Sequence, residues 1–218
     1  MISVYIVDIP KISPAADHIH FYNGVNTLIY NMSHNFINRR NLQSKIGKLL
    51  VNFAISKQLN ISGTDIYFTA DTHGKPVLRD ISSIHFNISH SGKYVVCAVS
   101  SETVGIDVEE IKDIDLKIAD RFFTKTERDS IYNQSENDRL REFYSVWTKK
   151  ESYLKMTGDR LSRPLNAFCV LDSDSLNVHF SHVILENDYI CHVCSDEDSV
   201  IEINNLSIEE LLSLLTKY

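Results

Sequence analysis

The chain has 218 residues, of which 43 % are hydrophobic and 23 % are charged, so it has enough apolar material for a sizeable core and does not resemble a disordered protein. Its formal net charge of −7 at pH 7 opposes a general nucleic-acid binder, because such proteins neutralise phosphates with a basic surface. Without an apolar run of about 18 residues, a signal-peptide pattern or a disulfide-rich composition, the protein is expected in the cytoplasm and not in a membrane.

The first half of the chain predicts one long helix among short strands. An apolar run at residues 2–7 predicts the first strand, and apolar residues at helical spacing predict a helix within residues 35–59. We expect the polar residues 89–92 to form a tight turn between two later strands. The short strands expected after the helix span residues 66–69, 77–78, 84–88 and 94–99.

The second half begins with a strand at residues 104–109 and then becomes helical. Thr124 followed three residues later by Glu127 has the spacing of a capping box. A long helix is predicted for residues 138–157, with Gly158 as its C-cap. The remaining elements expected are strands at residues 168–171, 178–185 and 189–193 and an amphipathic helix that begins at Ser207.

Each half therefore predicts a helix packed on a small sheet. We expect an α+β fold of two similar subdomains with mostly antiparallel sheets, related by a pseudo-twofold axis. The N-terminal subdomain is expected to span residues 1–103 and the C-terminal subdomain residues 104–218, with the active site at their interface.

Two acidic residues of the strand 104–109 form the first candidate site. Asp107 and Glu109 are two residues apart, so both side chains lie on one face of the strand, roughly 6–7 Å apart. Two carboxylates at this spacing suit a hard cation such as Mg²⁺, which also binds water and phosphate oxygens. The alternative is a half-exposed strand with solvated acidic residues.

The long helix carries the second candidate site. Trp147, Glu151 and Lys155 are four residues apart and share one helix face. A carboxylate beside an ammonium group on a face anchored by Trp147 can act as an acid/base pair. The alternative is an ordinary glutamate–lysine pair on an exposed helix.

Two polar segments of the first half form a third candidate site, for phosphate. Residues 86–92 end in two hydroxyl groups, an imidazole and a glycine, and residues 73–76 offer a lysine in a turn. Hydroxyl groups and exposed backbone N–H groups suit a phosphate group. The alternative is that both segments are simple polar turns.

Each of these segments alone is a weak signal. Because all of them occur together and in this order, the sequence resembles the surfactin-type (group II) 4′-phosphopantetheinyl transferases. The resemblance covers about residues 35–172, and its most specific parts are the Gly-Ile-Asp-Val-Glu and Trp-Thr-Lys-Lys-Glu-Ser segments. It implies transfer of the 4′-phosphopantetheine arm of coenzyme A to a serine of an apo acyl or peptidyl carrier protein, with release of 3′,5′-ADP. The matching segments are residues 73–76, 86–91, 105–109, 121–127, 147–155, 158 and 161–162.

The resemblance also implies roles for the acidic and basic residues. Asp107, Glu109 and Glu151 look like the ligands of Mg²⁺, for which Mn²⁺ is the alternative. Glu151 further resembles the base for the carrier serine, directly or through a water molecule. Lys155 resembles the group that contacts the phosphates and stabilises the leaving group. Lys150 is expected to support catalysis, either at the pyrophosphate or by placing Glu151.

Five residues of the first half, together with Lys155, resemble the coenzyme-binding set. Ser89 and His90 look like the phosphate-binding pair, and Lys75 with Pro76 like the loop at the adenine and phosphate end. Ser44 falls where the family has a threonine or serine on the coenzyme. The chain departs from the family at residues 27–32, where basic residues are often found and none is present. The nearest cations are Arg39, Arg40 and Lys45.

The carrier protein is expected to dock on a local apolar or basic patch, because the enzyme itself is acidic. The segment expected to provide this patch contains Phe122, Phe123, Lys125 and Arg128. The group II resemblance favours carriers of secondary metabolism, such as nonribosomal-peptide and polyketide carriers, over those of fatty-acid synthesis. A monomer is expected, because the two halves of one chain can form the active-site interface.

Three alternatives compete with this interpretation. A Mg²⁺-dependent phosphohydrolase or nucleotidyl transferase would use Asp107 and Glu109 but leaves the helix face unexplained. An inactive carrier-binding protein would be expected to lack Glu151 or Lys155, and both are present. A zinc site would use the H-x-x-H and C-x-x-C pairs at residues 179–194, but ligands three apart on a strand point to opposite faces.

Overall fold

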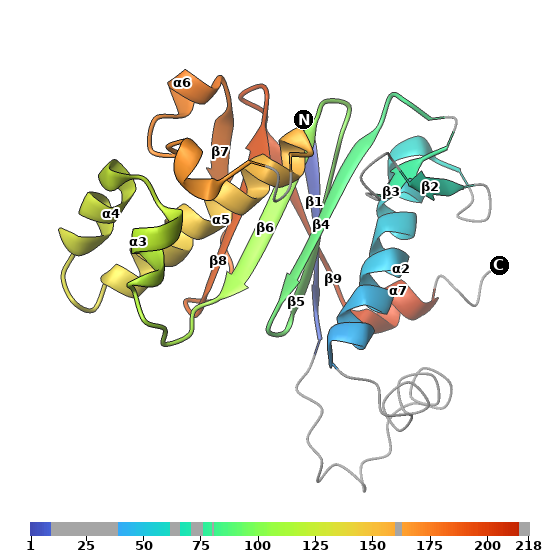
Figure 1. Ribbon diagram of the computed structural model, residues 1–218. Coiled ribbons are helices and arrows are strands. Elements are labelled where there is room, and N and C mark those ends of the chain that lie inside the picture. The colour runs from blue at the N-terminus through green and yellow to red at the C-terminus, as the bar shows by residue number, and fades with distance from the viewer. Residues whose placement is uncertain (10–38, 62–65, 71–75, 80, 160–162, 214–218) are drawn as a thin grey trace, which may run out of the picture.

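The computed structural model describes residues 1–9, 39–61, 66–70, 76–79, 81–159 and 163–213. It is an α+β structure in which two small sheets lie between two long helices (Figure 1). The elements of the first half are β1 (Ile2–Asp8), α2 (Arg39–Leu59), β2 (Phe68–Ala70), β3 (Pro76–Leu78), β4 (His85–Ser91) and β5 (Tyr94–Ser100). The second half contains β6 (Val104–Glu110), α3 (Ile118–Phe122), α4 (Lys125–Tyr132), α5 (Arg139–Thr157), η3 (Leu165–Ala167), α6 (Ser173–Leu176), β7 (His179–His182), β8 (Tyr189–Ser195), β9 (Ile201–Leu206) and α7 (Ile208–Ser213).

The two larger sheets are mostly antiparallel, as expected for the fold class, and β2 and β3 pair in a separate two-stranded antiparallel sheet. The first sheet has the strand order β4-β5-β1-β9, and the second has the order β6-β8-β7. The β1–β9 pair is parallel, whereas the β1–β5, β4–β5, β6–β8 and β7–β8 pairs are antiparallel. The sequence-based expectation of an α+β fold with a helix on a small sheet in each half is confirmed.

Three apolar clusters between the layers hold the fold together. The first lies between α2 and one face of the first sheet, and includes Ile46, Leu50 and Val95. The second lies between the two sheets, where the other face of the first sheet meets Ile106 and Val108 of β6. The third lies between the second sheet and α5. The strands β5 and β8 are therefore covered on both faces and buried throughout, whereas the edge strands β7 and β9 are partly exposed.

The ends of α4 and α5 are set by local sequence. Thr124 accepts a hydrogen bond from the N–H of Glu127, whose carboxylate accepts one from the N–H of Thr124, so the predicted capping box is present. Asp138 is the N-cap residue of α5, and Gly158 ends the helix with φ 79°, a left-handed conformation that favours glycine. The predicted bounds of this helix are confirmed.

Two sequence-based expectations about strands are wrong. Residues 89–91 are part of β4, which continues to Ser91, so the turn is shorter than expected and contains Gly92 with φ 54°. Residues 168–171 form no strand, because buried side chains bind their backbone. Lys150 Nζ donates to the carbonyl oxygen of Phe168, and Glu127 Oε1 accepts the N–H of Val170.

The last described elements of the chain return to the first sheet. β9 pairs with β1 along residues 201–206, and α7 contacts α2. The sequence analysis identified the helix but not the strand, whose alternation of apolar and polar residues is irregular. A division between residues 103 and 104 does not separate the two sheets completely, because β9 belongs to the first sheet and α7 contacts α2. The division into subdomains stays a prediction. Within the described ranges, no helix has the length and hydropathy needed to cross a membrane.

Candidate active site

The candidate site lies where the edge strands of the two sheets meet. β4 is an edge strand of the first sheet, and β6 is an edge strand of the second. Alternate side chains of β4 accept hydrogen bonds from the N–H groups of β6 that point away from β8. Asn87 Oδ1 accepts the N–H of Ile106 at 3.1 Å, and Ser89 Oγ accepts the N–H of Val108 at 3.4 Å. Ser91 Oγ accepts the N–H of Glu110 at 3.1 Å. Side-chain oxygens thus take the place of a partner strand along this edge.

Asp107 is at the centre of this junction. Its side chain points toward α5, because Ile106 and Val108 on the other face of β6 fill the core between the sheets. The residue is 4 % exposed. Its Oδ1 accepts hydrogen bonds from Ser89 Oγ at 2.9 Å and from Lys155 Nζ at 2.7 Å. Its Oδ2 is buried and has no hydrogen-bond partner within the described part of the chain.

Gly105 allows α5 to lie directly on β6. A Cβ atom at this position would lie 1.9 Å from the carbonyl oxygen of Ser152 and 2.7 Å from the backbone nitrogen of Met156. Both are backbone atoms, so no side-chain rotation can relieve the overlap. This close approach lets Lys155 reach Asp107 and also the carbonyl oxygen of Ile106, at 3.1 Å. The first residue of the Gly-Ile-Asp-Val-Glu segment therefore sets the position of the helix relative to the carboxylates.

Two further carboxylates belong to the same electrostatic cluster. Burial, and secondly the charge of Asp107, raise the pKa of Glu109 to about 7, although its Oε2 accepts a hydrogen bond from Ser91 Oγ at 2.7 Å. Burial and the charge of Asp107 also raise the pKa of Glu151 above its usual range, while Lys155 acts in the opposite direction. The three carboxylates repel one another, and the ammonium group of Lys155 offsets only part of this repulsion.

The donor set fits a hard cation, but the described residues do not form a closed metal cage. No group of three or more His, Cys, Asp or Glu side chains in the described ranges is arranged to hold a metal ion. Mutually repelling carboxylates and the unpartnered Oδ2 of Asp107 are features that a bound cation would relieve. Mg²⁺ typically takes one or two carboxylates and completes its octahedron with water and substrate phosphate oxygens, so a full cage is not required.

Lys150 does not belong to this cluster. Its side chain is fully buried and binds Glu127 Oε1 at 2.8 Å, together with the carbonyl oxygens of Leu165 at 2.7 Å and Phe168 at 2.6 Å. Its ammonium group also lies 4.3 Å from the ring centroid of Phe168. The expected contact between Lys150 and a pyrophosphate is inconsistent with these contacts. The other expected role, that Lys150 helps to place Glu151 on the same helix, stays a prediction.

The expected coenzyme-binding residues lie on several elements around β4. Ser89 and His90 are neighbours on β4 and so point to opposite faces, Ser89 toward Asp107 and His90 toward the α2 side with Ile88. Ser44 is an exposed residue of α2. Pro76 begins β3, whereas Lys75 and residues 27–32 lie outside the described residues. The structure therefore brings Ser89 to the acidic cluster and gives His90 a different surrounding.

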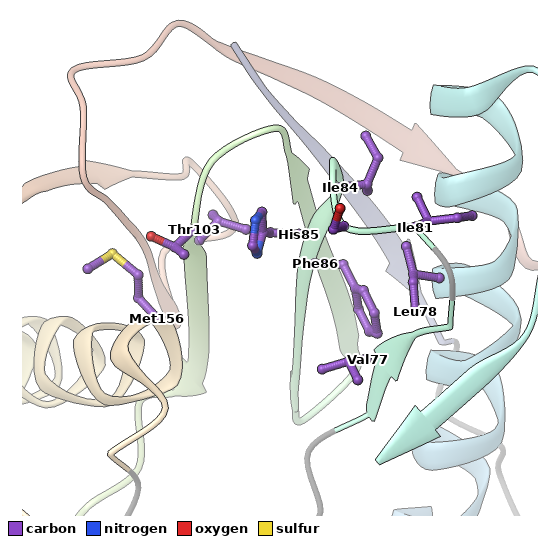
Figure 2. A pocket seen from close by; sticks show the side chains of 10 residues that line it. Val77, Leu78, Ile81, Ile84, His85, Phe86, Thr103 and Met156 are labelled. Atoms are coloured by element: carbon purple, nitrogen blue, oxygen red, sulfur yellow. The ribbon is translucent and has the colours of Figure 1, made fainter. Parts of the chain in front are cut away.

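A largely apolar pocket opens between the two halves beside this cluster. Figure 2 shows Val77 and Phe86 on one side of it and Met156 on the other, next along α5 from Lys155. The β2–β3 hairpin, the beginnings of β4 and β6, and the end of α5 enclose it. It is lined by Val77, Leu78, Ile81, Ser82, Ile84, His85, Phe86, Thr103, Val104 and Met156.

The four-ligand zinc site is not formed. Cys191 belongs to the apolar cluster between the sheets, whereas Cys194 faces α5, and both thiols are fully buried. Burial raises the pKa of both thiols, which opposes the thiolate form that binds zinc.

The sequence analysis placed Ser91 in the candidate phosphate segment but did not predict its contact with the carboxylates. Its hydroxyl group contacts both Glu109 and the backbone of Glu110. The alternation of Asn87, Ser89 and Ser91 along one face of a strand was the signal for it, and the expectation of a turn at residues 89–92 concealed this signal.

Comparison with known proteins agrees with these features. A model of the 4′-phosphopantetheinyl transferase superfamily matches residues 103–208, and a model of an N-terminal 4′-phosphopantetheinyl transferase domain matches residues 31–102. The chain is 43 % identical over 125 residues to the 4′-phosphopantetheinyl transferase Sfp of Bacillus subtilis (strain 168), a match that covers 57 % of this chain and 56 % of that relative.

A second relative matches along more of the chain. The 4′-phosphopantetheinyl transferase gsp of Aneurinibacillus migulanus is 36 % identical over 184 residues, which cover 79 % of this chain and 77 % of that relative. A third, the 4′-phosphopantetheinyl transferase psf-1 of Bacillus pumilus, is 42 % identical over 123 residues, which cover 56 % of this chain and 53 % of the relative. The matches to the two Bacillus relatives thus span little more than half of their length. The extent of the gsp match and the order of the two family models show that the chain belongs to the surfactin-type group of the 4′-phosphopantetheinyl transferase superfamily.

Proposed function

We propose that the protein transfers the 4′-phosphopantetheine arm of coenzyme A to a serine hydroxyl of an apo acyl or peptidyl carrier protein and releases 3′,5′-ADP. The observation that carries this proposal is the cluster of the buried Asp107 with the half-buried Glu109, Glu151 and Lys155 at the junction of the two sheets, in a chain of this family. The relatives named above bear the same activity in their names.

Asp107, Glu109 and Glu151 would hold Mg²⁺ in this site, with Mn²⁺ as the alternative. The unpartnered Oδ2 of Asp107 offers a ligand atom without breaking a contact within the described residues. When bound, the cation would supply positive charge to the pyrophosphate and polarise its oxygens. The carboxylates must be ionised to bind it, and their raised pKa values make binding compete with protons.

The side chains of this protein would then position the reactants and move one proton. The serine oxygen forms a bond to the β-phosphorus while the bond from that phosphorus to the bridging oxygen of 3′,5′-ADP breaks. Glu151 accepts the proton of the serine hydroxyl, which its raised pKa favours. Lys155, held by Asp107 and by the carbonyl of Ile106, stabilises the negative charge that develops on the leaving group.

The pocket between the two halves suits the adenine base of coenzyme A. Its walls carry Val77 and Leu78, which directly follow Pro76 in the segment expected at the adenine end, and the aromatic ring of Phe86. An apolar pocket with few polar groups is the usual site for a planar base. Ser89, which donates to Asp107, lies beside the acidic cluster and would contact the phosphates there, whereas His90 faces the α2 side of β4 and would contact the coenzyme from that side.

The carrier protein would approach along α3 and α4. Phe122 is half-buried and packs edge-on against Trp147 of α5, with ring centroids 6.2 Å apart, and Lys125 is exposed beside Asp129. Phe123 is 3 % exposed and belongs to the core, so it is not part of a docking surface. A Phe122→Ala or Lys125→Ala protein that kept an unchanged KM for the carrier would contradict this placement.

Intact-mass spectrometry tests the proposed reaction. An apo carrier protein mixed with coenzyme A, Mg²⁺ and this protein should gain the mass of one phosphopantetheine group, and should gain none without Mg²⁺. The absence of any gain with fatty-acid, polyketide and peptide carriers would contradict the proposal. The phosphohydrolase and inactive-binder alternatives are not favoured by the family matches, and the monomeric state and cytoplasmic location stay predictions.

A further inference from the structure

The position of Glu151 depends on the position of α5. This helix lies across β6 and β8 of the second sheet (Figure 1). Within the described residues, Glu151 interacts with Asp107 and Lys155 through their charges, and its carboxylate has no hydrogen bond that would hold it in place. Whatever fixes α5 on the sheet therefore also fixes the distance between Glu151 and the other carboxylates.

A buried hydrogen bond joins α5 to β8, the central strand of the second sheet. Oγ1 of Thr148, a fully buried residue of α5, lies 2.8 Å from Nδ1 of His192 on β8. The same Oγ1 lies 2.7 Å and 3.2 Å from the carbonyl oxygens of Tyr144 and Ser145, which can only accept, so the hydroxyl proton is donated to its own helix. Nδ1 of His192 therefore carries a ring proton and donates it to Thr148.

This hydrogen bond lies next to the acidic cluster. His192 is directly opposite Asp107 in the β6–β8 pair, so both side chains lie on the face of the sheet that α5 covers. Asp107 accepts a hydrogen bond from Lys155, and its neighbour His192 donates one to Thr148. Two adjacent positions of the sheet thus hold α5, through residues about two helical turns apart. Glu151 lies between these two residues along the helix.

The contacts between α5 and the sheet differ in stiffness. The side chain of Lys155 is long, flexible and 28 % exposed, so its bond to Asp107 can persist while the helix slides. The close approach at Gly105 limits the distance between α5 and β6 but provides no directional bond. The bond between Thr148 and His192 is directional, buried and made by short side chains with few torsions, so it resists both sliding and rotation.

We propose that Thr148 and His192 are positioning residues, which fix the register of α5 on the second sheet and thereby place Glu151 relative to Asp107. This inference rests on the proposed function, in which Glu151 accepts the proton of the carrier serine. Neither residue touches the reactants; both act through the placement of the helix.

Intact-mass kinetics of Thr148 variants test this role. Thr148→Val keeps the shape of the side chain and removes the hydroxyl group, and it should lower kcat by about 10²-fold through misplacement of Glu151. KM should change little, because most of the expected coenzyme and carrier contacts lie on other elements. Thr148→Ser keeps the hydroxyl group and should restore kcat. Thr157→Val is the matched control, since the hydroxyl group of Thr157 accepts or donates only at the end of its own helix.

Changing His192 tests whether the two residues act as a unit. His192→Leu should lower kcat as much as Thr148→Val, and the double variant should be no slower than either single variant. The double variant leaves no buried donor unsatisfied, so it should fold even if a single variant does not. Val178→Ala, in the same apolar cluster as α5, should lower stability without lowering kcat. Losses that multiply in the double variant, or an equal loss in Val178→Ala, would overturn the proposal.

Crystal structures of the native and Thr148→Val proteins decide the inference independently of the reaction. α5 should move on β6 by about 1 Å in the variant. A helix that keeps its place, or a Thr148→Val protein with native kcat, would overturn the positioning role. A native protein that modifies no carrier would instead contradict the proposed function, and the two crystal structures would still decide whether Thr148 and His192 place α5.

Discussion

Two of the three lysines of α5, Lys150 and Lys155, differ in burial and in how completely the groups around them are hydrogen-bonded. Lys150 and Glu127 are both fully buried and form an ion pair. Lys150 also donates to two carbonyl oxygens, and Glu127 also accepts the backbone N–H groups of Thr124 and Val170. Lys155 and Asp107 lie at the sheet junction, where Asp107 keeps one buried oxygen without a partner among the described residues. A complete network stabilises the fold, whereas an incomplete one has capacity for a ligand.

The largest expected effect is a loss of activity on changing Asp107, which with Lys155 forms the incompletely hydrogen-bonded pair. Asp107→Asn keeps the shape of the side chain and removes the charge that a cation and Lys155 require. Transfer of phosphopantetheine should fall by about 10³-fold, with little change in the free energy of unfolding, because Lys155 is 28 % exposed and can be hydrated. Intact-mass kinetics and urea denaturation measure both quantities. Glu110→Gln, on the same strand, is the control and should stay active.

Lys150 and Glu127, the completely hydrogen-bonded pair, should affect stability more than activity. Lys150→Met leaves the carboxylate of Glu127 buried without its counterion, so the free energy of unfolding should fall by roughly 3 kcal/mol. Half-maximal activity should require the same Mg²⁺ concentration in the fraction that remains folded. Lys149→Met, which changes the half-buried neighbour on the same helix, should alter stability little. A Lys150→Met protein of normal stability that no longer responds to Mg²⁺ would reverse our assignment of the two lysines.

Changing Gly105 tests whether the short distance between α5 and β6 is needed for Lys155 to reach Asp107. Gly105→Ala places a Cβ atom against the backbone of Ser152 and Met156, so the helix must move. A displacement of about 1 Å at Lys155 should lower kcat by about 10²-fold. Gly47→Ala is the control, because the three atoms nearest to its Cβ would be side-chain atoms of Ile88 and Val95, with the closest at the flexible end of Ile88. Equal losses in the two variants would contradict the explanation.

The smallest effect expected comes from Ser91. Ser91→Ala removes the hydroxyl group that donates to Glu109 and accepts the N–H of Glu110, and should destabilise the fold by about 1 kcal/mol. Glu109 would then be less well placed, so a higher Mg²⁺ concentration should be needed for half-maximal activity. Ser101→Ala, at an exposed residue just outside the sheet, should change neither quantity. An unchanged Mg²⁺ dependence in the Ser91→Ala protein would show that Glu109 does not depend on this hydrogen bond.

Local sequence predicted more of the helices than of the site contacts. The bounds of α5 follow from its apolar spacing and from Gly158, and the start of α4 from the capping box, all of which are encoded within a few residues. The alignment of Asp107 with Glu109 on one strand face was predictable for the same reason. The separation of Lys150 from Lys155 was not, because it depends on Glu127 and on carbonyl oxygens that fold back from residues 165 and 168. The strand β9 depends likewise on a distant partner, β1.

The pairing of β1 with β9 has a consequence for synthesis of the protein on the ribosome. Ile2 is opposite Ile201 in this parallel pair, whereas the other neighbour of β1, β5, ends at Ser100. Because synthesis proceeds at about 5–20 residues per second, one edge of β1 stays unpaired for roughly 5–20 s after β5 has been synthesised. An unpaired strand edge is a template for other chains. A nascent chain stalled before residue 201 is therefore expected to need protection by a chaperone, and slow codons in that interval should lower the soluble yield.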